Sequence, residues 1–260
     1  MSIRVAIIRG TGYLDFFDKV EDSRKIGSPY GPSSLITIGK VGKKYVALLP
    51  RHGETYRFPP HKINYRANIW ALNSLGVERI IAINRVGAVN DSIKTGDILI
   101  PHDIIDLTKN PDSTFHDNAP VTHVDVTQPY CPELRNSLIR ATPKRTGKIW
   151  SKSVLACRDG PRFETRAEIK MLKILGCDSV GMTTAPEVFL ARELKLCYAS
   201  VCTVTNRASG LQTRVNTEEI IRMSNKRKKI ITQLIKETLR RIPDKRNCEC
   251  FTDSKETIIR

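Results

Sequence analysis

Two pairs of polar residues that could bind an anion come directly after short apolar segments of the chain. Arg51 and His52 follow one such segment, and Asn84 and Arg85 follow another. A guanidinium presents a planar pair of donors that fits a phosphate, and a neighbouring imidazole or amide adds a further donor. These pairs predict a phosphate site, with a structural ion pair at Arg51 as the alternative.

A third candidate for the same site is the small-residue turn after the first apolar segment. Gly10 would let backbone N–H groups approach an anion, and Thr11 would add a hydroxyl. A dinucleotide-binding fingerprint would need a third glycine, which the residues after Gly12 do not supply. An ordinary tight turn is the alternative. Anion-binding groups at the ends of three apolar segments together favour a phosphate site more strongly than one such group would alone.

Three further segments carry groups suited to a heterocycle and a sugar. Phe163 and Glu164 follow a Gly-Pro pair, and they could stack a ring and accept its N–H. Asn206 ends an apolar segment and carries both a donor and an acceptor, so it could bind a base edge with an N–H beside a carbonyl. Met182 offers a soft apolar surface and Thr183 a hydroxyl. The alternative for Glu164 is an ordinary acid in the first turn of a helix.

Hydrophobic patterning indicates which elements position these groups. Near-continuous apolar runs predict strands buried on both faces at residues 3–8, 45–49, 79–83, 97–100 and 197–205. Helical spacing predicts helices over 64–75, 165–175 and 186–195, and a last helix that begins after an Asn216 cap and ends at Pro243. This alternation favours an α/β fold around a mainly parallel or mixed sheet, which binds ligands at the carboxyl ends of its strands.

Length and composition limit the domain organisation. The chain has 260 residues, 40% of them hydrophobic, and it shows no internal repeat, low-complexity segment or linker. We therefore expect one domain over residues 1–243, followed by a tail over 244–260. No apolar run reaches the roughly 18 residues that a membrane helix needs. The first residues show no cleavage site of a signal peptide, so we expect a cytoplasmic protein.

The net charge of +16 raises the question of a polyanionic partner. Residues 222–260 hold twelve basic and five acidic side chains, so much of the excess lies at the end of the chain. Aromatic residues do not alternate with these basic residues as they do in proteins that bind single strands. We therefore favour a solvated basic helix face and do not expect nucleic acid as a partner.

Seven cysteines are many for an intracellular protein. No pair of C-x-x-C elements with histidines at zinc spacing occurs, so we expect no metal site. Cys197 with Cys202, and the pair Cys248 and Cys250, could instead form disulfides, which intracellular proteins of hyperthermophiles tolerate. Seven reduced and mostly buried thiols are the alternative.

Taken in order, these motifs resemble the nucleoside phosphorylases of the purine nucleoside phosphorylase and methylthioadenosine phosphorylase family. The resemblance covers residues 3–243. Its most specific stretches are Arg51-His52-Gly53 followed by residues 59–68, residues 160–168, and residues 181–187. The Cys248-Glu249-Cys250 tail resembles those of archaeal methylthioadenosine phosphorylases.

The resemblance implies a single α/β domain whose central mixed sheet forms a distorted barrel flanked by helices. It implies phosphorolysis of a purine nucleoside, with inorganic phosphate as co-substrate and with no metal or organic cofactor. It also implies a homotrimer or a dimer of trimers. Carried over by position, the phosphate site would consist of Thr11, Arg51, His52, Asn84, Arg85 and Thr183, and the nucleoside site of Phe163, Glu164, Met182, Asn206, Arg207 and Ala208. His123 would reach the 5′ end of the sugar from a neighbouring subunit.

The residues at the expected base site favour a 6-oxopurine. A carboxylate at Glu164 can accept the N1–H of such a base, and the amide of Asn206 can donate to O6. Adenine instead presents a lone pair at N1 and an amino donor, so its polar edge would be mismatched at a cost of a few kcal/mol, about 1–3 per group. We therefore expect inosine, guanosine or 5′-methylthioinosine as the substrate. In that reaction Asn206, Glu164 and His52 would be the catalytic residues.

Three arginines depart from the family pattern, which usually has Gly at 9, Ala at 85 and a non-basic residue at 207. A cation at Arg85 would strengthen phosphate binding or fill the pocket, Arg9 would crowd the turn, and Arg207 would add charge beside the base. Two other functions therefore stay open beside the favoured one. They are a methylthioadenosine phosphorylase and a nucleotide-binding relative without catalytic activity.

Overall fold

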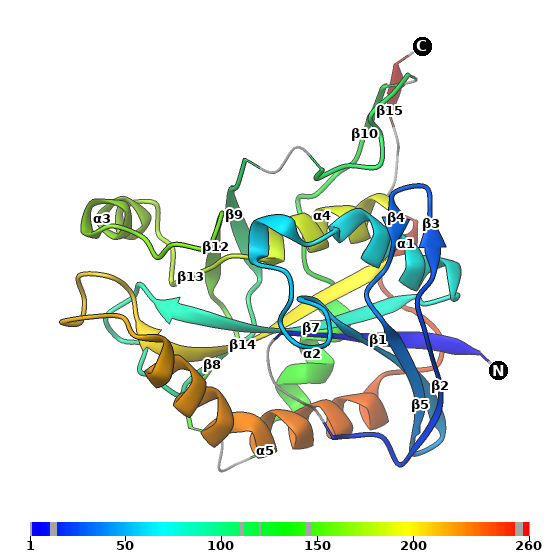
Figure 1. Cartoon of the computed structure of the whole chain (residues 1–260), viewed down its shortest axis with the longest axis horizontal. Coiled ribbons are helices and arrows are strands. Elements are labelled where there is room, and N and C mark those ends of the chain that lie inside the picture. The colour runs from blue at the N-terminus through cyan, green and yellow to red at the C-terminus, as the bar shows by residue number, and fades with distance from the viewer. Residues whose placement is uncertain are drawn as a thin grey trace.

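A computed structural model describes residues 2–10, 15–109, 112–119, 121–143, 147–252 and 257–259 (Figure 1). The strands are β1 (Ile3–Arg9), β2 (Lys19–Arg24), β3 (Gly27–Ser28), β4 (Gly31–Pro32), β5 (Ile36–Val41), β6 (Lys44–Pro50), β7 (Arg79–Ala88), β8 (Ile98–Leu99), β9 (Asp103–Leu107), β10 (Val121–His123), β11 (Ile149–Trp150), β12 (Val154–Arg158), β13 (Ser179–Gly181), β14 (Cys197–Arg207) and β15 (Thr257–Ile259). The helices are η1 (Pro60–Lys62), α1 (Tyr65–Ser74), α2 (Pro132–Ala141), α3 (Arg166–Ile174), α4 (Thr184–Glu193), α5 (Thr217–Arg241) and η2 (Glu249–Phe251).

The central sheet is mixed. Strands β6, β1, β7 and β14 lie side by side and parallel, and β5 and β8 join them antiparallel. A second arm branches from the end of β7 through β13 to β12 and β9, and β9 and β12 run across the direction of β7 and β14 in Figure 1. The single α/β domain with a central mixed sheet and flanking helices is therefore confirmed.

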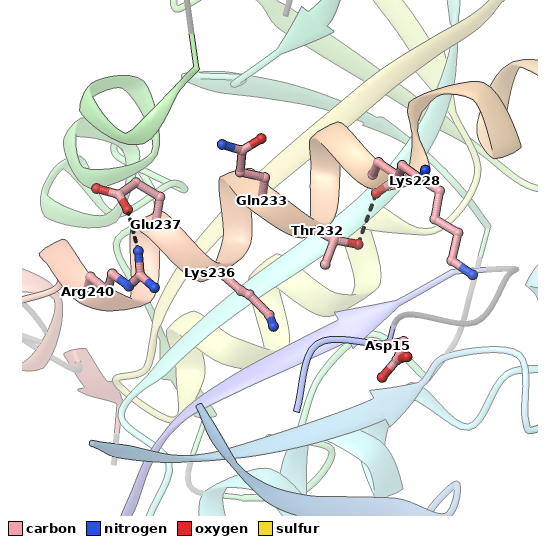
Figure 2. Close-up of a pocket in the computed structure, with 8 residues that line it drawn as sticks. Asp15, Lys228, Thr232, Gln233, Lys236, Glu237 and Arg240 are labelled. Carbon is pink, nitrogen blue, oxygen red and sulfur yellow. Dashed lines mark hydrogen bonds and ion pairs between the residues drawn. The ribbon is translucent and has the colours of Figure 1, made fainter. Parts of the chain in front are cut away.

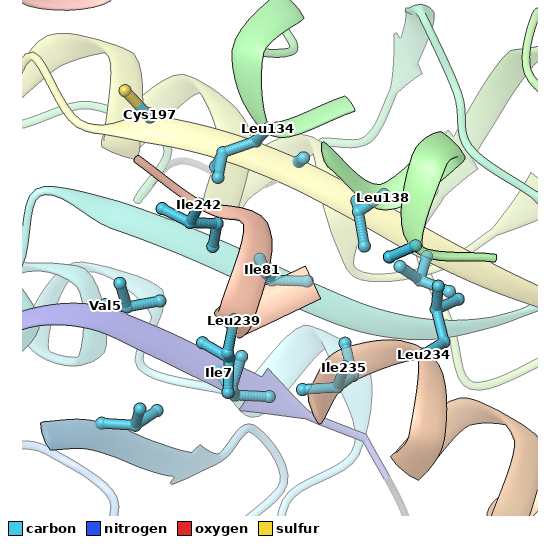
Figure 3. Close-up of a cluster of buried hydrophobic side chains, with 14 of the residues drawn as sticks. Val5, Ile7, Ile81, Leu134, Leu138, Cys197, Leu234, Ile235, Leu239 and Ile242 are labelled. Carbon is cyan, nitrogen blue, oxygen red and sulfur yellow. The ribbon is translucent and has the colours of Figure 1, made fainter. Parts of the chain in front are cut away.

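Helices cover both faces of the parallel strands because side chains alternate along a strand. Val5 and Ile7 of β1 face the cluster that includes α2 and α5, whereas Ala6 and Ile8 face the cluster that includes α1 and α4. Figure 3 shows the first of these clusters, with Leu134 of α2 and Leu239 of α5 meeting the strands. Such near-complete burial accounts for the apolar strand runs in the sequence.

The predicted helices are present with small shifts in their bounds. The side chain of Asn216 caps α5 by accepting hydrogen bonds from the backbone N–H groups of residues 218 and 219, and the helix ends two residues before Pro243. Thr165 and Glu168 form a reciprocal capping box at the start of α3. Helix α4 begins two residues before Pro186, which lies in its first turn.

The third predicted strand is longer than residues 79–83. Strand β7 continues to Ala88 because β14 pairs with it along that whole length and β13 adds antiparallel pairing at its end. Asn84 and Arg85 therefore lie within the strand and not beyond it. No helix in the described part of the chain is long and apolar enough to cross a membrane.

Candidate functional site

A cavity of about 490 Å³ opens where the carboxyl ends of β1, β7 and β14 meet the start of α4. Pockets of this size suit a ligand such as a nucleoside. Segments from all parts of the chain contribute to its wall. The predicted site residues that line it are Arg51, His52, Arg85, Phe163, Glu164, Met182, Thr183 and Asn206.

Arg51 is held in place by a buried ion pair. Its Nε and Nη2 donate to the two carboxylate oxygens of Glu187 at 2.5 and 2.8 Å, and both side chains are almost fully buried. Glu187 also accepts a hydrogen bond from the Tyr198 hydroxyl at 2.8 Å. Burial lowers the pKa of Arg51, but the Glu187 carboxylate raises it more, so Arg51 stays charged. Arg51 therefore forms a structural ion pair and also lines the cavity.

His52 is a neutral imidazole with one defined tautomer. Its Nδ1 lies 2.8 Å from the carbonyl oxygen of Phe58, and because a carbonyl only accepts, Nδ1 carries the hydrogen. Nε2 is therefore left as an acceptor. Burial, together with the positive charges of Arg51 and Arg85, lowers the pKa of His52 to about 4.

This pKa predicts a pH dependence of stability. Between pH 6.5 and 4 the imidazole binds a proton in the unfolded chain but not in the folded one, so stability falls as the pH drops through this window. In His52→Gln that contribution disappears, and the unfolding free energy should change less steeply with pH. Denaturant unfolding at several pH values measures the slope. His61→Gln, at an exposed position, should keep the wild-type slope; an unchanged slope in His52→Gln would refute the assignment.

Asn84 lies behind the cavity wall and not in it. Its Nδ2 donates to Oγ1 of Thr183 at 3.1 Å, and its Oδ1 accepts from the Ser200 hydroxyl at 2.9 Å. Thr183 is the residue that precedes α4, so it lies at the positive end of the helix dipole. Asn84 therefore orients the Thr183 hydroxyl at the cavity.

Glu164 and Phe163 form another part of the wall. Glu164 is 9% exposed, and burial raises the pKa of its carboxyl, although nearby Arg158 and Arg162 oppose this shift. Phe163 keeps 39% of its surface exposed, as a ring available for stacking would. These two neighbours bring an apolar face and a hydrogen-bond acceptor to one cavity.

The amide of Asn206 has a defined orientation. One of its terminal atoms lies 2.9 Å from the carbonyl oxygen of Arg207 and must be the nitrogen, since a carbonyl only accepts. Oδ1 accepts from the Thr205 hydroxyl at 2.9 Å. Asn206 lines the cavity, and Nδ2 has a second hydrogen that it could donate to a ligand there.

Three other predicted site residues that the structure describes do not line this cavity. Arg207 donates from its Nη2 to the carboxylate of Asp91 at 2.6 Å. Ala208 is buried in the apolar cluster around α3. His123 is exposed on β10, which stands away from the sheet in Figure 1. Thr11 lies outside the described residues.

Several residues that line the cavity were not predicted from the sequence. Tyr56 lies in the loop after β6, with its ring centroid 4.3 Å from that of His52. Thr217, Ile220 and Ile221 come from the first five residues of α5. Ile221 is 46% exposed. The signal available in the sequence was an apolar residue at the start of an otherwise highly charged helix.

A second hollow lies beside α5, between this helix and Asp15 (Figure 2). Its wall is mostly charged, with Lys228, Lys236 and Arg240 beside Glu237 and Asp15. Arg240 and Glu237 form an exposed ion pair at 3.2 Å. This hollow is the basic helix face that the sequence predicted.

The structure decides between the two alternatives for the cysteines. All seven lie in the described part of the chain as buried free thiols, so the expectation of disulfides is wrong and the alternative of reduced, buried thiols is confirmed. Cys197 and Cys202 are five positions apart on β14 and belong to different apolar clusters, because an odd spacing places side chains on opposite faces. Four others meet as a possible metal-ligand set: Cys131, Cys197, Cys248 and Cys250.

Comparison with known proteins gives consistent matches over most of the chain. The chain is 46% identical to the 6-oxopurine nucleoside phosphorylase of Pyrococcus furiosus, with 95% of this chain and 96% of the relative covered. It is 40% identical to the S-methyl-5′-thioadenosine phosphorylase of the same organism over the same shares of the two chains. A methylthioadenosine phosphorylase from an antarctic soil metagenomic library has a similar structure, with a TM-score of 0.89, 34% identity, and coverage of 97% of this chain and 91% of that one.

The family comparison agrees with the predicted resemblance. A family model described as the phosphorylase superfamily matches residues 4–240. These residues include every described residue of the cavity wall. The chain therefore belongs to the phosphorylase superfamily.

Proposed function

We propose that this protein is a pentosyltransferase that cleaves 6-oxopurine nucleosides with phosphate. Inosine, guanosine or 5′-methylthioinosine would give the free purine and ribose 1-phosphate or its methylthio derivative. The observation that carries the proposal is the pairing of an acceptor, Glu164, with an oriented amide donor, Asn206, in one cavity. The relative named 6-oxopurine nucleoside phosphorylase is also more similar, at 46%, than the relative that acts on methylthioadenosine, at 40%.

The phosphate would bind at the other end of this cavity. Arg85 lines it, and Thr183 presents a hydroxyl at the start of α4, where backbone N–H groups and the helix dipole favour an anion. Asn84 supports this end through Thr183. Arg51 would contribute positive charge at the wall while Glu187 fixes its position. Phosphate is the co-substrate in this proposal, and no organic cofactor takes part.

The chemistry follows from where charge develops. As the bond between C1′ and N9 breaks, the sugar becomes cationic and the purine anionic. A phosphate held below C1′ stabilises the cation and is in position to attack it. The N–H of Asn206 stabilises the leaving purine at O6 or N7, and Glu164 holds N1–H. The Nε2 acceptor of His52 would take a hydrogen bond from a sugar or phosphate hydroxyl.

The 5′ end of the nucleoside would be completed by a second subunit. His123 is exposed and lies outside the cavity wall, as expected of a residue that acts in a neighbouring site. We propose a homotrimer, alone or paired into a hexamer, that works in the cytoplasm in purine salvage.

Ile220, Ile221 and Tyr56 add apolar surface to the cavity, which suits a methylthio group as well as a hydroxymethyl group.

A base-release assay tests the function. Inosine, guanosine, 5′-methylthioinosine, adenosine and 5′-methylthioadenosine are offered in parallel, with and without phosphate, and the free base is separated by chromatography. We expect hypoxanthine and guanine only when phosphate is present. Release of adenine alone would support phosphorolysis but would contradict the proposed preference for 6-oxopurine nucleosides. No release from any substrate would instead support the nucleotide-binding relative without catalytic activity.

Two of the three unusual arginines provide a matched pair of variants. Arg85 lines the cavity, whereas Arg207 is bonded to Asp91. Arg85→Ala should raise the KM for phosphate about 10-fold, the loss of one charged hydrogen bond of about 1.5 kcal/mol. Arg207→Ala should change it less than about 2-fold, in line with an exposed ion pair. Initial rates at varied phosphate measure both, and equal effects would contradict the placement of Arg85.

A further inference from the structure

Four of the seven cysteines come together at one place far from the cavity described above. The sulfur atoms of Cys131, Cys197, Cys248 and Cys250 all lie within 4.8 Å of one another. They come from the residue before α2, the start of β14 and the tail around η2. Two of these side chains are fully buried, and the other two are 8% and 6% exposed. The proposed phosphorolysis makes no use of this group.

We propose that these four cysteines bind one Zn²⁺ ion as a tetrahedral tetrathiolate site. Zinc–sulfur bonds of about 2.3 Å place the four sulfurs of such a site about 3.8 Å apart. Cys197 and Cys248 are separated by 3.2 Å, and all pairs fall below 4.8 Å, so small movements of the side chains give this geometry. Thiolate ligands select soft ions such as zinc over calcium or magnesium.

The surroundings offset the negative charge that a zinc tetrathiolate would carry. Arg79 is 1% exposed and lies beside Cys197 in the register of β7 and β14. Arg192, which is 5% exposed, donates to the carbonyl of Cys250 at 3.3 Å. Cys131 occupies the N-cap position of α2, where the helix dipole favours a thiolate. Arg79 also pairs with Glu78 and Glu133, and Glu133 accepts a hydrogen bond from the backbone N–H of residue 247.

Coordination also accounts for how the tail is held. Zinc binding displaces four thiol protons and needs no oxidant, whereas two disulfides would require an acceptor for four electrons. The ion would join the tail at residues 248–250 to the starts of α2 and β14, three segments that are distant in sequence. It would thereby fix the C-terminal tail to the body of the domain.

The test uses the full-length protein purified without added metal. Elemental analysis should find about one zinc per chain. Cys250→Ser should lose it, while Cys177→Ser, a buried cysteine in another cluster, should retain it. In the wild type, replacement of zinc by Co²⁺ should produce sulfur-to-cobalt charge-transfer bands that disappear when zinc is returned. The cobalt spectrum of the wild type tests thiolate coordination even if Cys250→Ser does not fold.

Three results would overturn the proposal. The first is a metal-free protein in which alkylation and mass spectrometry find the four cysteines joined as disulfides. The second is a reduced protein that binds neither zinc nor cobalt. The third is a Cys250→Ser variant that keeps its full zinc content.

Discussion

Replacing Glu164 by Ser and Asn206 by Asp together should move substrate preference from inosine toward adenosine. A serine hydroxyl can donate to the N1 lone pair of adenine, and an aspartate can accept from its amino group. We expect the ratio of kcat/KM for adenosine to that for inosine to rise about 100-fold or more, because two mismatched polar groups cost about 1–3 kcal/mol each. Parallel base-release assays with the two nucleosides measure this ratio.

The ratio is the correct readout because the absolute rate should fall. Nδ2 of Asn206 donates to the carbonyl of Arg207 at 2.9 Å, and an Asp carboxylate in that position would face another acceptor. Glu168→Gln is a suitable control, since Glu168 bonds Arg158 and Arg162 outside the cavity wall. It should leave the ratio within about 2-fold of wild type. An unchanged preference for inosine in the double variant would refute the roles given to Glu164 and Asn206.

Glu187→Gln should lower the free energy of unfolding by about 3–5 kcal/mol. The change removes the carboxylate that pairs with Arg51 and leaves a buried guanidinium without its counter-charge, since both side chains are almost fully buried. The Tyr198 hydroxyl keeps only a neutral acceptor. Denaturant unfolding at a fixed protein concentration measures the loss, because any oligomer makes stability depend on concentration.

Glu237→Gln is the matched control for this prediction. Glu237 pairs with Arg240 at 3.2 Å and with Arg241 at 2.7 Å on the exposed face of α5. Exposed ion pairs contribute little, so the expected loss is below about 1 kcal/mol. If the two variants lost equal stability, the Arg51–Glu187 pair would not be the buried support that its geometry indicates.

The sequence by itself determined the elements and the chemistry at their ends. Apolar runs such as residues 3–8 and 197–205 predicted β1 and β14, because a strand buried on both faces needs apolar side chains nearly throughout. The cap at Asn216 predicted the start of α5. Arg85, Glu164 and Asn206 were predicted as site residues from their types and from their places beside such elements, and all three line the cavity. All of these are local signals, read within a few residues of one another.

Only the tertiary structure decided which residues meet. Arg51 and Glu187 are 136 positions apart, and Cys131 and Cys248 lie on segments that nothing in the local pattern connects. From the sequence, the ion pair of Arg51 was therefore only one of two alternatives, and Cys197 was paired with Cys202 as a candidate disulfide. The physical reason is that strand order and the packing of helices on the sheet fix these contacts, whereas periodicity reports only which face of an element is buried.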